Sequence, residues 1–549
     1  MAIERFNRGL AGGFNSSYVP PYAAAVEAAY AANPVPGLAS ITVAGGVNFL
    51  GKNYNNWTDG TNRLLPNVSG VYAFNPKTVF RMGWGMFSDT FNDFNSRPGQ
   101  NGYSQTTNTP VSTDNGLTFC CGVGAAGGFG NITPLNNPFP TLAGGTHLTQ
   151  PFGNTFGPDT LDGQGFTYYP RDYSPALTQR WKASAQRELF KNQLVDVSYN
   201  GSYASYPFNE SLSPLPEQYW ATGNSYNPTE QAAMTTNVTN PFYIGNLTGL
   251  QQSNPALYNY LDTISWFTSK TLQTQQLLRA NLNSGAGLTE AGAVRAKSWY
   301  QDLEFLYTKR FSRGVMTSLT YTRAYGRQQW QPNSFSPSLA WQLDPNTRPN
   351  RLVWSAVWEL PFGKGRQWIT HGPVQHIVGG WQLSWVYQYQ TGAPDSWGNL
   401  FYYGTIDQVV QALAESATHA ANSRQELSTQ AVYGPAFNPA DSATGAIPGD
   451  FVGFEGRPTL QPGSYQLREF PQYINALRAD PIRQWDLKIY RKFTLHERLN
   501  LNLGVDALNL TNHVQFGAPN LSPTSTAFGS VTSQANGARQ LQLNVRIEF

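Results

Sequence analysis

The sequence predicts an all-β fold, an antiparallel up-and-down transmembrane β-barrel with about 11–12 strands present and long extracellular loops. Three observations predict this fold. Apolar and polar residues alternate with period two in strand-length segments, and no apolar window reaches the 18 residues of a membrane-spanning helix. The connections between the segments alternate between short and long, as in membrane barrels.

The composition agrees with a surface that partly faces lipid. Only 13% of the 549 residues are charged, whereas 14% are aromatic, and the polarity comes mainly from Asn, Gln, Ser, Thr and Gly. The net charge is only +3, and Lys and Arg are scattered singly along the chain. Since nucleic-acid binding requires a basic face, we expect no nucleic-acid partner.

The clearest strand is the last segment, which ends at the C-terminal residue. Its apolar residues occupy every second position and are separated by polar ones: Leu541, Leu543, Val545, Ile547 and Phe549 against Gln542, Asn544, Arg546 and Glu548. A soluble edge strand of this kind would invite aggregation. The segment is therefore predicted to close a membrane barrel.

Ten upstream segments have a related pattern and bring the predicted total to eleven strands. They cover residues 68–74, 78–89, 177–189, 193–206, 298–311, 315–327, 351–362, 381–390, 485–490 and 499–507. The aromatic residues of this set are predicted to face lipid or the interfacial girdles: Trp354, Trp358, Trp381, Trp385 and Tyr387. The acidic ones are predicted to wet the lumen: Asp196, Asp302, Glu304, Glu359 and Asp506.

The connections fall into two classes that alternate along the chain. Short ones cover 75–77, 190–192, 312–314, 363–379 and 494–497, and long ones cover 90–176, 207–297, 328–350, 393–482 and 513–539. We predict periplasmic short turns and extracellular long loops. Helical spacing in PPYAAAVEAAYAANP and in IDQVVQALAES predicts two helices embedded in loops, neither with a partner helix nearby.

Several segments in order resemble the barrel of Oar-like TonB-dependent receptors. These are NPKTVFRMGWGMFSD, ALTQRWKASAQREL, QLVDVSYNGSYA, RLVWSAVWELPFGKGR, GGWQLSWVYQYQTGAP and RQWDLKIYRKFTLHERLNLNLGVDALNLTNHVQFGAPN. ERFNRGLAGGF and AAYAANPVPGL look like the family's mid-barrel region. The resemblance implies an outer-membrane location and a parent with a signal peptide, a regulatory-like sandwich, a plug and a barrel of about 22 strands.

The resemblance also implies a division of the chain and a set of partners. Residues 1–67 would form a mid-barrel loop region with a short helix, and 68–549 would form the strands and loops of the C-terminal half of the barrel. We expect the signal peptide, the sandwich and the plug to be absent. The implied partners are outer-membrane lipid, the barrel-assembly machinery through the strand ending at Phe549, and TonB only through the plug.

No motif predicts an enzyme, and we expect no catalytic, cofactor-binding or metal-binding residues. G-x-S-x-G and H-E-x-x-H do not occur, the six histidines are scattered, and LPFGKGR lacks the complete phosphate-loop pattern. Cys120 and Cys121 are adjacent in a Gly-rich stretch and are interpreted as a loop pair that an oxidising compartment could join. The candidate ligand contacts are four aromatic residues of a long loop: Tyr219, Trp220, Tyr226 and Trp266.

The sequence therefore predicts the barrel portion of a TonB-dependent receptor that takes up a large solute or displays loops at the cell surface. Two alternatives stay open. One is a self-standing passive porin of about 12 strands, and the other is a soluble secreted β-rich adhesin or carbohydrate-binding protein. The ligand is not predicted.

Overall fold

The computed structural model describes most of the strands and a large part of the connections. The described residues are 12–49, 64–88, 102–103, 106–107, 115, 117, 148, 150–168, 176–222, 228–333, 338–399, 401–402, 459–460, 465–468, 470–495, 499–521 and 531–549. The Cys120–Cys121 pair and the helix predicted in IDQVVQALAES lie outside them. None of the helices in this part of the chain is long and apolar enough to span a bilayer.

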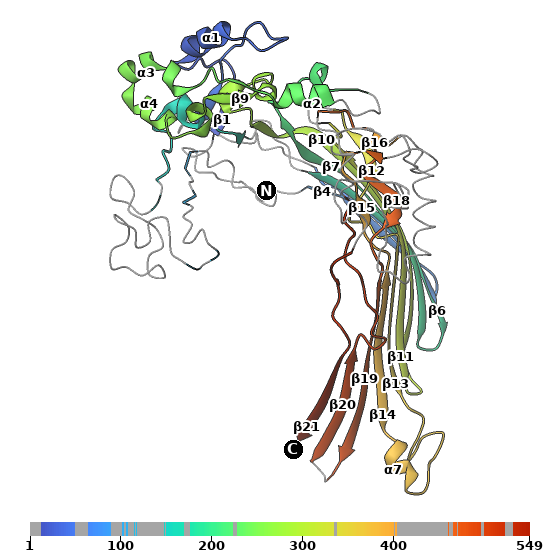
Figure 1. The fold of residues 1–549 in the computed structure, drawn as a ribbon. Helices are drawn as coiled ribbons and strands as arrows, with labels where there is room; N and C mark the ends of the chain where they lie inside the picture. The colour runs from blue at the N-terminus through green and yellow to red at the C-terminus, as the bar shows by residue number, and fades with distance from the viewer. Residues whose placement is uncertain are drawn as a thin grey trace, which may run out of the picture.

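One large antiparallel sheet dominates the molecule (Figure 1). Its main path joins β3 (Asn67–Asn75), β4 (Thr78–Ser88), β6 (Leu177–Phe190), β7 (Gln193–Ser211), β10 (Leu288–Ser312), β11 (Val315–Trp330), β13 (Asn350–Glu359), β14 (Trp381–Gln390), β19 (Ile482–Thr494), β20 (Asn500–Leu508) and β21 (Gln540–Glu548). Each strand pairs with the next one along this path. All eleven predicted strands are confirmed, and so is the alternation of short and long connections.

Two further strands extend the sheet to thirteen. β12 (Ala340–Leu343) pairs with the outer end of β11, and β5 (Phe166–Tyr168) pairs in parallel with the start of β10. In the described part of the chain, β3 and β21 are the two ends of the sheet, and neither pairs with the other. The closed barrel and its strand number therefore stay predictions.

The pairing register separates an apolar face from a polar face. Paired residues share a face of the sheet, so partners can be followed from strand to strand. One row reads Val315, Trp358, Leu383, Ile489, Val505 and Leu543, and the next row reads Met316, Val357, Ser384, Lys488, Asp506 and Gln542. We call the face of the first row the apolar face and that of the second row the polar face. Leu541 and Leu543 on the apolar face are 68% and 71% exposed, so no second layer covers them.

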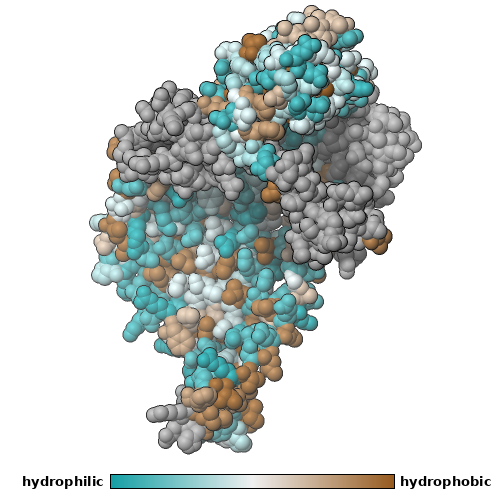
Figure 2. All heavy atoms as spheres, turned by 90° about the vertical axis from the view of Figure 1, so that its left-hand side faces the viewer, coloured by the Kyte–Doolittle hydropathy of each residue, from teal (hydrophilic) through white to brown (hydrophobic). Residues whose placement is uncertain are grey.

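Both predicted sets of strand residues lie on the expected sides. The five aromatic residues predicted to face lipid are on the apolar face, and the five acidic residues predicted to wet the lumen are on the polar face. Figure 2 views the left-hand side of Figure 1, where hydrophilic residues predominate over the strand region and hydrophobic ones gather at the lower tip.

The long connections build a compact cap at one end of the sheet, opposite the C-terminus (Figure 1). Its helices are α1 (Ala23–Ala32), η2 (Gly157–Leu161), η3 (Glu217–Tyr219), α2 (Pro228–Thr235), η4 (Ile244–Asn246), α3 (Thr248–Ser253), α4 (Pro255–Leu261), α5 (Ser265–Thr268), α6 (Thr274–Leu277) and η5 (Leu282–Ser284). Two small sheets accompany them: β1 (Gly12–Asn15) with β2 (Gly46–Phe49), and β8 (Asn237–Thr239) with β9 (Thr271–Gln273). Strands β7 and β10 continue into this cap.

The cap has the main hydrophobic core of the described chain. Val26, Leu247, Leu261 and Phe267 are fully buried there, and the rings of Tyr22 and Phe267 meet edge to face at 5.5 Å. Helix α1 forms where it was predicted, since its run of Ala favours a helix. The prediction that it lacks a partner helix is wrong, because α1 packs against η4, which is distant in the sequence. Periodicity within a segment carries no signal of such long-range packing.

Smaller elements lie at the cap end and at the short-turn end of the strands. β15 (Pro394–Ser396) pairs with β18 (Tyr473–Arg478), and β16 (Phe401–Tyr402) pairs with β17 (Thr459–Leu460), near the cap end. The opposite end is the short-turn end, where helix α7 (Val374–Val378) follows β13.

The α7 turn lies against the apolar face. Trp381 and Arg491, a cross-strand pair on that face, both donate hydrogen bonds to the Ile377 carbonyl, at 2.9 and 2.5 Å. Arg491 also donates to the carbonyl of His376, and its guanidinium stacks 4.0 Å from the Phe493 ring centre. Backbone carbonyls and an aromatic ring thus cover a buried cation on a mainly apolar surface.

Candidate functional site

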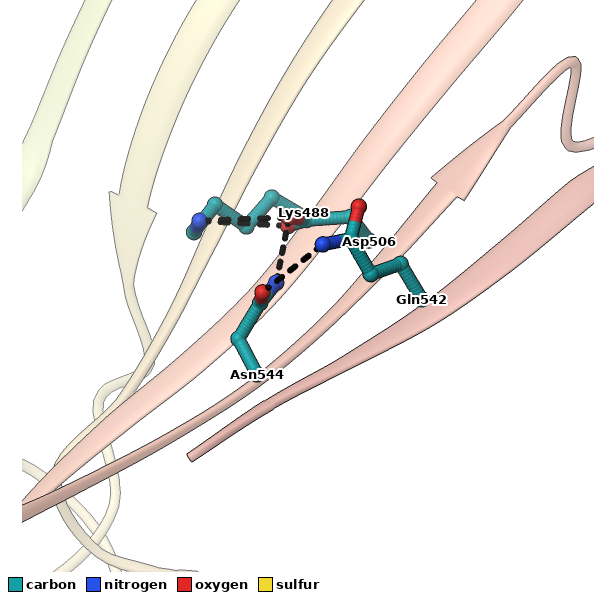
Figure 3. A network of polar contacts seen from close by, with 4 residues as sticks. All are labelled: Lys488, Asp506, Gln542 and Asn544. Carbon is teal, nitrogen blue, oxygen red and sulfur yellow. Dashed lines mark hydrogen bonds and ion pairs between the residues drawn. The ribbon is translucent and has the colours of Figure 1, made fainter. Parts of the chain in front are cut away.

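The polar face is best defined at the three C-terminal strands, where it forms a connected network (Figure 3). Lys488 Nζ lies 3.2 Å from Asp506 Oδ1, and Asn544 Nδ2 donates to Asp506 Oδ2 at 2.6 Å. Gln542 Nε2 donates to Asn544 Oδ1 at 3.2 Å. Four side chains from β19, β20 and β21 are therefore held in one row on the polar face.

This network is half exposed, so it contributes modestly to stability. The Lys488 and Asp506 side chains are 48% and 26% exposed, and ion pairs at such exposure contribute about 0–1 kcal/mol. Lys492 and Arg546 approach Glu548 at 3.6 and 3.4 Å on the same face. These polar side chains are thus suited to contact water and ions along the polar face of the sheet.

The polar face continues across the middle strands. Asn200 Nδ2 donates to Asp302 Oδ1 at 2.7 Å between β7 and β10, and Arg81 Nη1 donates to Gln186 Oε1 at 2.8 Å between β4 and β6. Two shallow hollows mark this wall. One, of about 400 Å³, is lined by Ser384, Lys488 and Asp506 together with apolar side chains such as Met316, Val357 and Val386. The other, of about 600 Å³, is lined by Arg180, Lys182 and Asn200 together with aromatic side chains such as Trp84 and Tyr300.

The apolar face has the aromatic side chains of the same strands. Trp354 and Trp385 meet edge to face at 5.2 Å, and Tyr387 meets Trp485 at 6.4 Å. Trp354 Nε1 donates to Thr317 Oγ1 at 3.0 Å. Indoles with an apolar body and one polar tip are typical of the interfacial girdles of membrane proteins.

A buried polar cluster connects three segments of the cap. Asp162, which is 2% exposed, accepts a hydrogen bond at 2.6 Å from Asn283 Nδ2, and its Oδ2 lies 2.5 Å from the Tyr22 hydroxyl. Tyr18 donates to Asp159 Oδ2 at 2.9 Å. The cluster connects the segment before α1, the η2 segment and η5, which are distant in sequence.

Burial dominates the electrostatics of this cluster. Loss of hydration raises the pKa of the Asp162 carboxyl well above its ordinary value, and the charge of Asp159 adds to this, while hydrogen bonds with Tyr22 and Asn283 oppose it. Burial also raises the pKa of Asp159. No group of three or more His, Cys, Asp or Glu side chains suited to a metal ion occurs among the residues that the structure describes.

The four candidate ligand contacts occupy different environments. Trp266 is only 5% exposed and packs at 5.5 Å against Phe242 in the cap core. Tyr219 and Trp220 are half-buried against the same core, and Tyr226 lies outside the described residues. The structure therefore brings three of them to the cap, with Trp266 in its interior. Ligand contact by these residues stays a prediction.

Sequence reasoning missed the polar cluster and a group of arginines near the cap end of the sheet. Asp162 and Asn283 are single residues in loops of no recognisable pattern, and their proximity depends on the cap fold. The arginines Arg323, Arg348 and Arg478 lie in separate segments and meet only when the strands pair. The one available signal was that Arg323 breaks the apolar alternation of its strand.

Comparisons with known proteins agree with this geometry. The family model described as an outer membrane beta barrel domain matches residues 14–542. No match was found among curated proteins.

Solved structures with partial similarity are outer-membrane receptors and transporters. The ferripyoverdine receptor of Pseudomonas aeruginosa is 9% identical, with 89% of this chain and 33% of that chain covered and a TM-score of 0.31. The transporter YddB of Escherichia coli is 8% identical, with 88% and 40% covered and a TM-score of 0.34. The siderophore receptor PiuA of Acinetobacter baumannii is 7% identical, with 94% and 38% covered and a TM-score of 0.32. The chain thus spans 33 to 40% of the length of these structures.

Proposed function

The chain belongs to the outer membrane beta barrel domain family, and from this premise we propose that it forms part of a TonB-dependent receptor that takes up a large solute. Family membership places the chain in the outer membrane and supports a transporter-type function. The observation that supports the proposal most directly is the register, which keeps one face apolar and the other polar across strands from β11 to β21. Such a sheet fits a wall between hydrocarbon and a water-filled lumen.

The polar face supports passage of a hydrated solute rather than a reaction. Its side chains are mainly amides, hydroxyls and half-exposed ion pairs, and we assign no catalytic role to any of them. The cap supplies an extracellular surface in this arrangement, with the short turns in the periplasm. Surface display of the cap is the second activity that this arrangement supports.

Several partners follow from the proposal. Lipid contacts the apolar face, as the outer-membrane location requires. The side chain of Phe549 is 99% exposed at the end of the last strand, which supports recognition by the assembly machinery. TonB would act through a plug in the complete receptor.

The passive porin is the remaining alternative. The soluble adhesin is set aside, because the family is an outer-membrane one and the apolar stripe of β21 is exposed rather than packed in an interior. A porin and a receptor barrel share the two-faced sheet. They differ in whether the pore conducts without energy input.

Planar bilayers test the proposal with the full chain. The single-channel current and its ion selectivity are recorded for the parent chain, for Lys488→Glu on the polar face and for Ile489→Val, its neighbour on the apolar face. A lumen wall predicts that Lys488→Glu shifts selectivity toward cations, whereas Ile489→Val leaves it unchanged. Equal selectivity in all three would contradict a lumen at the polar face. A receptor barrel and a porin both predict the shift, and solute uptake by cells that stops when TonB is removed would favour the receptor over the porin.

A further inference from the structure

Four arginines lie at one level of the sheet, at the ends of the strands nearest the cap. Asn350 begins β13 and pairs with Arg323, and Gln390 ends β14 and pairs with Ile482, the first residue of β19. Arg348 precedes Asn350 by two residues, Arg478 ends β18, and Arg483 follows Ile482. Arg323, Arg348 and Arg483 therefore start within two residues of a single cross-strand row, and Arg478 lies four residues before Ile482.

The register puts two of the four on the apolar face. Arg323 is two residues beyond Tyr321 on β11, and Tyr321 pairs with Leu352 on that face. Arg483 pairs with Tyr389, which follows Tyr387 on the same side of β14. Arginine is uncommon on this face, where most neighbours toward the short-turn end are Leu, Ile, Trp and Tyr and where Arg491 is covered by the α7 turn.

The level matches the outer edge of a bilayer. A tilted strand crosses the hydrocarbon in about 9–11 residues. Counted from Val315, the first residue after the short turn, Arg323 is the ninth residue of β11. On β19, Arg483 precedes the other end, Thr494, by eleven residues. Both guanidinium groups thus reach the zone of lipid headgroups.

Hydrogen bonds connect Arg323 with Arg478, and the charge of Arg348 also acts on Arg478, so we treat Arg323, Arg348 and Arg478 as one cluster. Arg323 Nη1 donates to Asn350 Oδ1 at 2.9 Å, and the Asn350 backbone N–H donates to Thr391 Oγ1 at 3.2 Å. The carbonyl of the next residue, Gly392, accepts from Arg478 Nη1 at 3.1 Å. Three residues, Asn350, Thr391 and Gly392, therefore connect the side chains of Arg323 and Arg478.

The cluster has an excess of positive charge. Among the residues that the structure describes, none of its three guanidinium groups forms an ion pair with a carboxylate. Asp395, whose charge acts on Arg478, is buried, and burial raises the pKa of Asp395 to about 6 against the opposing effect of Arg478. Burial lowers the pKa of Arg478, and the charges of Arg348 and Arg323 lower it further. An anion at this place would relieve that repulsion.

We propose that the arginine cluster binds the phosphate group of a lipid headgroup in the outer leaflet. The planar guanidinium fork matches phosphate oxygens, and Arg323, which lies on the apolar face, presents the cluster to lipid rather than to the lumen. This inference rests on the proposed orientation, with the cap outside the cell. It adds a specific lipid site to the general lipid contact of the barrel.

Lipid retention by the full chain in mild detergent tests the proposal. Native mass spectrometry compares phosphatidic acid with diacylglycerol of the same acyl chains, for the parent, for each of Arg323→Gln, Arg348→Gln and Arg478→Gln, and for the triple variant. We expect the parent to prefer phosphatidic acid and each single variant to lose about fivefold in affinity. Arg327→Gln is the matched control, because Arg327 lies four residues farther out on the same face and stacks over Trp341 at 5.9 Å.

Three outcomes would overturn the proposal. The first is equal retention of phosphatidic acid and diacylglycerol. The second is an equal loss of affinity for phosphatidic acid in Arg327→Gln and in the cluster variants. The third is binding of inorganic phosphate in calorimetry without retention of phosphatidic acid. Heat-modifiable gel mobility selects folded protein before the measurement, and the single variants suffice where the triple variant does not fold. Native mass spectrometry measures bound lipid and does not depend on transport. A negative result for lipid binding therefore leaves the proposed transport function untouched, and the reverse also holds.

Discussion

The Asp162 carboxyl Oδ2 lies 2.5 Å from the hydroxyl oxygen of Tyr22, 140 residues earlier in the chain. Tyr22 also meets Asn283 Oδ1, whose orientation is fixed because Asn283 Nδ2 donates to the Gly45 carbonyl at 2.6 Å. A phenol has a single proton, and an amide oxygen can only accept. The single phenol proton of Tyr22 is therefore shared between Asp162 Oδ2 and Asn283 Oδ1, and burial of the Asp162 carboxyl favours its neutral form.

The first prediction is that the cap loses stability as the pH rises. The pKa of Asp162 is raised in the folded cap, so folding takes up a proton above the unfolded value of about 4. The stabilisation is complete below that value and is lost as the pH rises through the folded pKa, by up to ~1.4 kcal/mol per pH unit. Intrinsic tryptophan fluorescence during urea titrations at several pH values measures this loss.

Asp162→Asn separates this effect from other titrations. Its amide is uncharged at every pH and can accept one of the two hydrogen bonds that Asp162 accepts from Tyr22 and Asn283, so the cap of this variant should depend less on pH than the parent. Asp159→Asn tests the neighbouring acid, which contributes through its charge. An unchanged pH profile in Asp162→Asn would contradict a neutral carboxyl at this position.

The second prediction concerns the cap core. Phe267→Ala removes a fully buried ring that meets Tyr22 edge to face, and such substitutions cost about 3–5 kcal/mol. We expect the cap to become sensitive to protease while the strands stay protected, as limited proteolysis with peptide mapping would show. Val19→Ala is the control, since Val19 is exposed. Simultaneous loss of strand protection would mean that cap and sheet unfold together.

The third prediction compares the two faces at adjacent positions. Leu543→Arg puts a charge on the apolar face and should destabilise the folded chain in lipid vesicles by about 2–4 kcal/mol if the site is near the bilayer midplane. Gln542→Arg places the same side chain on the polar face and should have little effect. Urea titration with heat-modifiable mobility as the readout compares the two, and equal costs would contradict the assignment of lipid to the apolar face.

The fourth prediction concerns the polar row of Figure 3. Asp506→Ala removes the acceptor shared by Lys488 and Asn544, and its cost should stay near 1 kcal/mol because these side chains are half exposed. A matched Lys488→Met variant should cost about as much. A loss several times larger would show that the row is a buried structural network instead of a solvated wall.

Local alternation predicted the sheet because each strand has its own two-faced pattern. The stripe of β21 and the aromatic stripe of β14 specify both the strand and its sides without knowledge of the neighbours. The register follows once short turns join adjacent strands. The strand bounds differ most at β10, which starts at Leu288 rather than at residue 298, because its first part joins the cap instead of crossing the sheet.

The cap was not predictable in this way. Its core joins residues such as Tyr22, Leu215 and Phe267, and each lies in a short segment without a long periodic stripe. For the same reason Trp266, chosen as a candidate surface contact, is buried there. Long connections rich in aromatic residues signal packing as readily as binding, and only the three-dimensional contacts distinguish the two.

The guanidinium of Arg491 has a consequence for protein engineering. Two carbonyls of the α7 turn solvate it on the apolar face, so that connection is longer than loop closure requires. Trimming the turn to two residues would strip the charge of its only polar shell within the described chain, unless Arg491 were replaced by Leu or Met at the same time. A shorter α7 turn is therefore compatible with the fold only when the charge at position 491 is removed in the same variant.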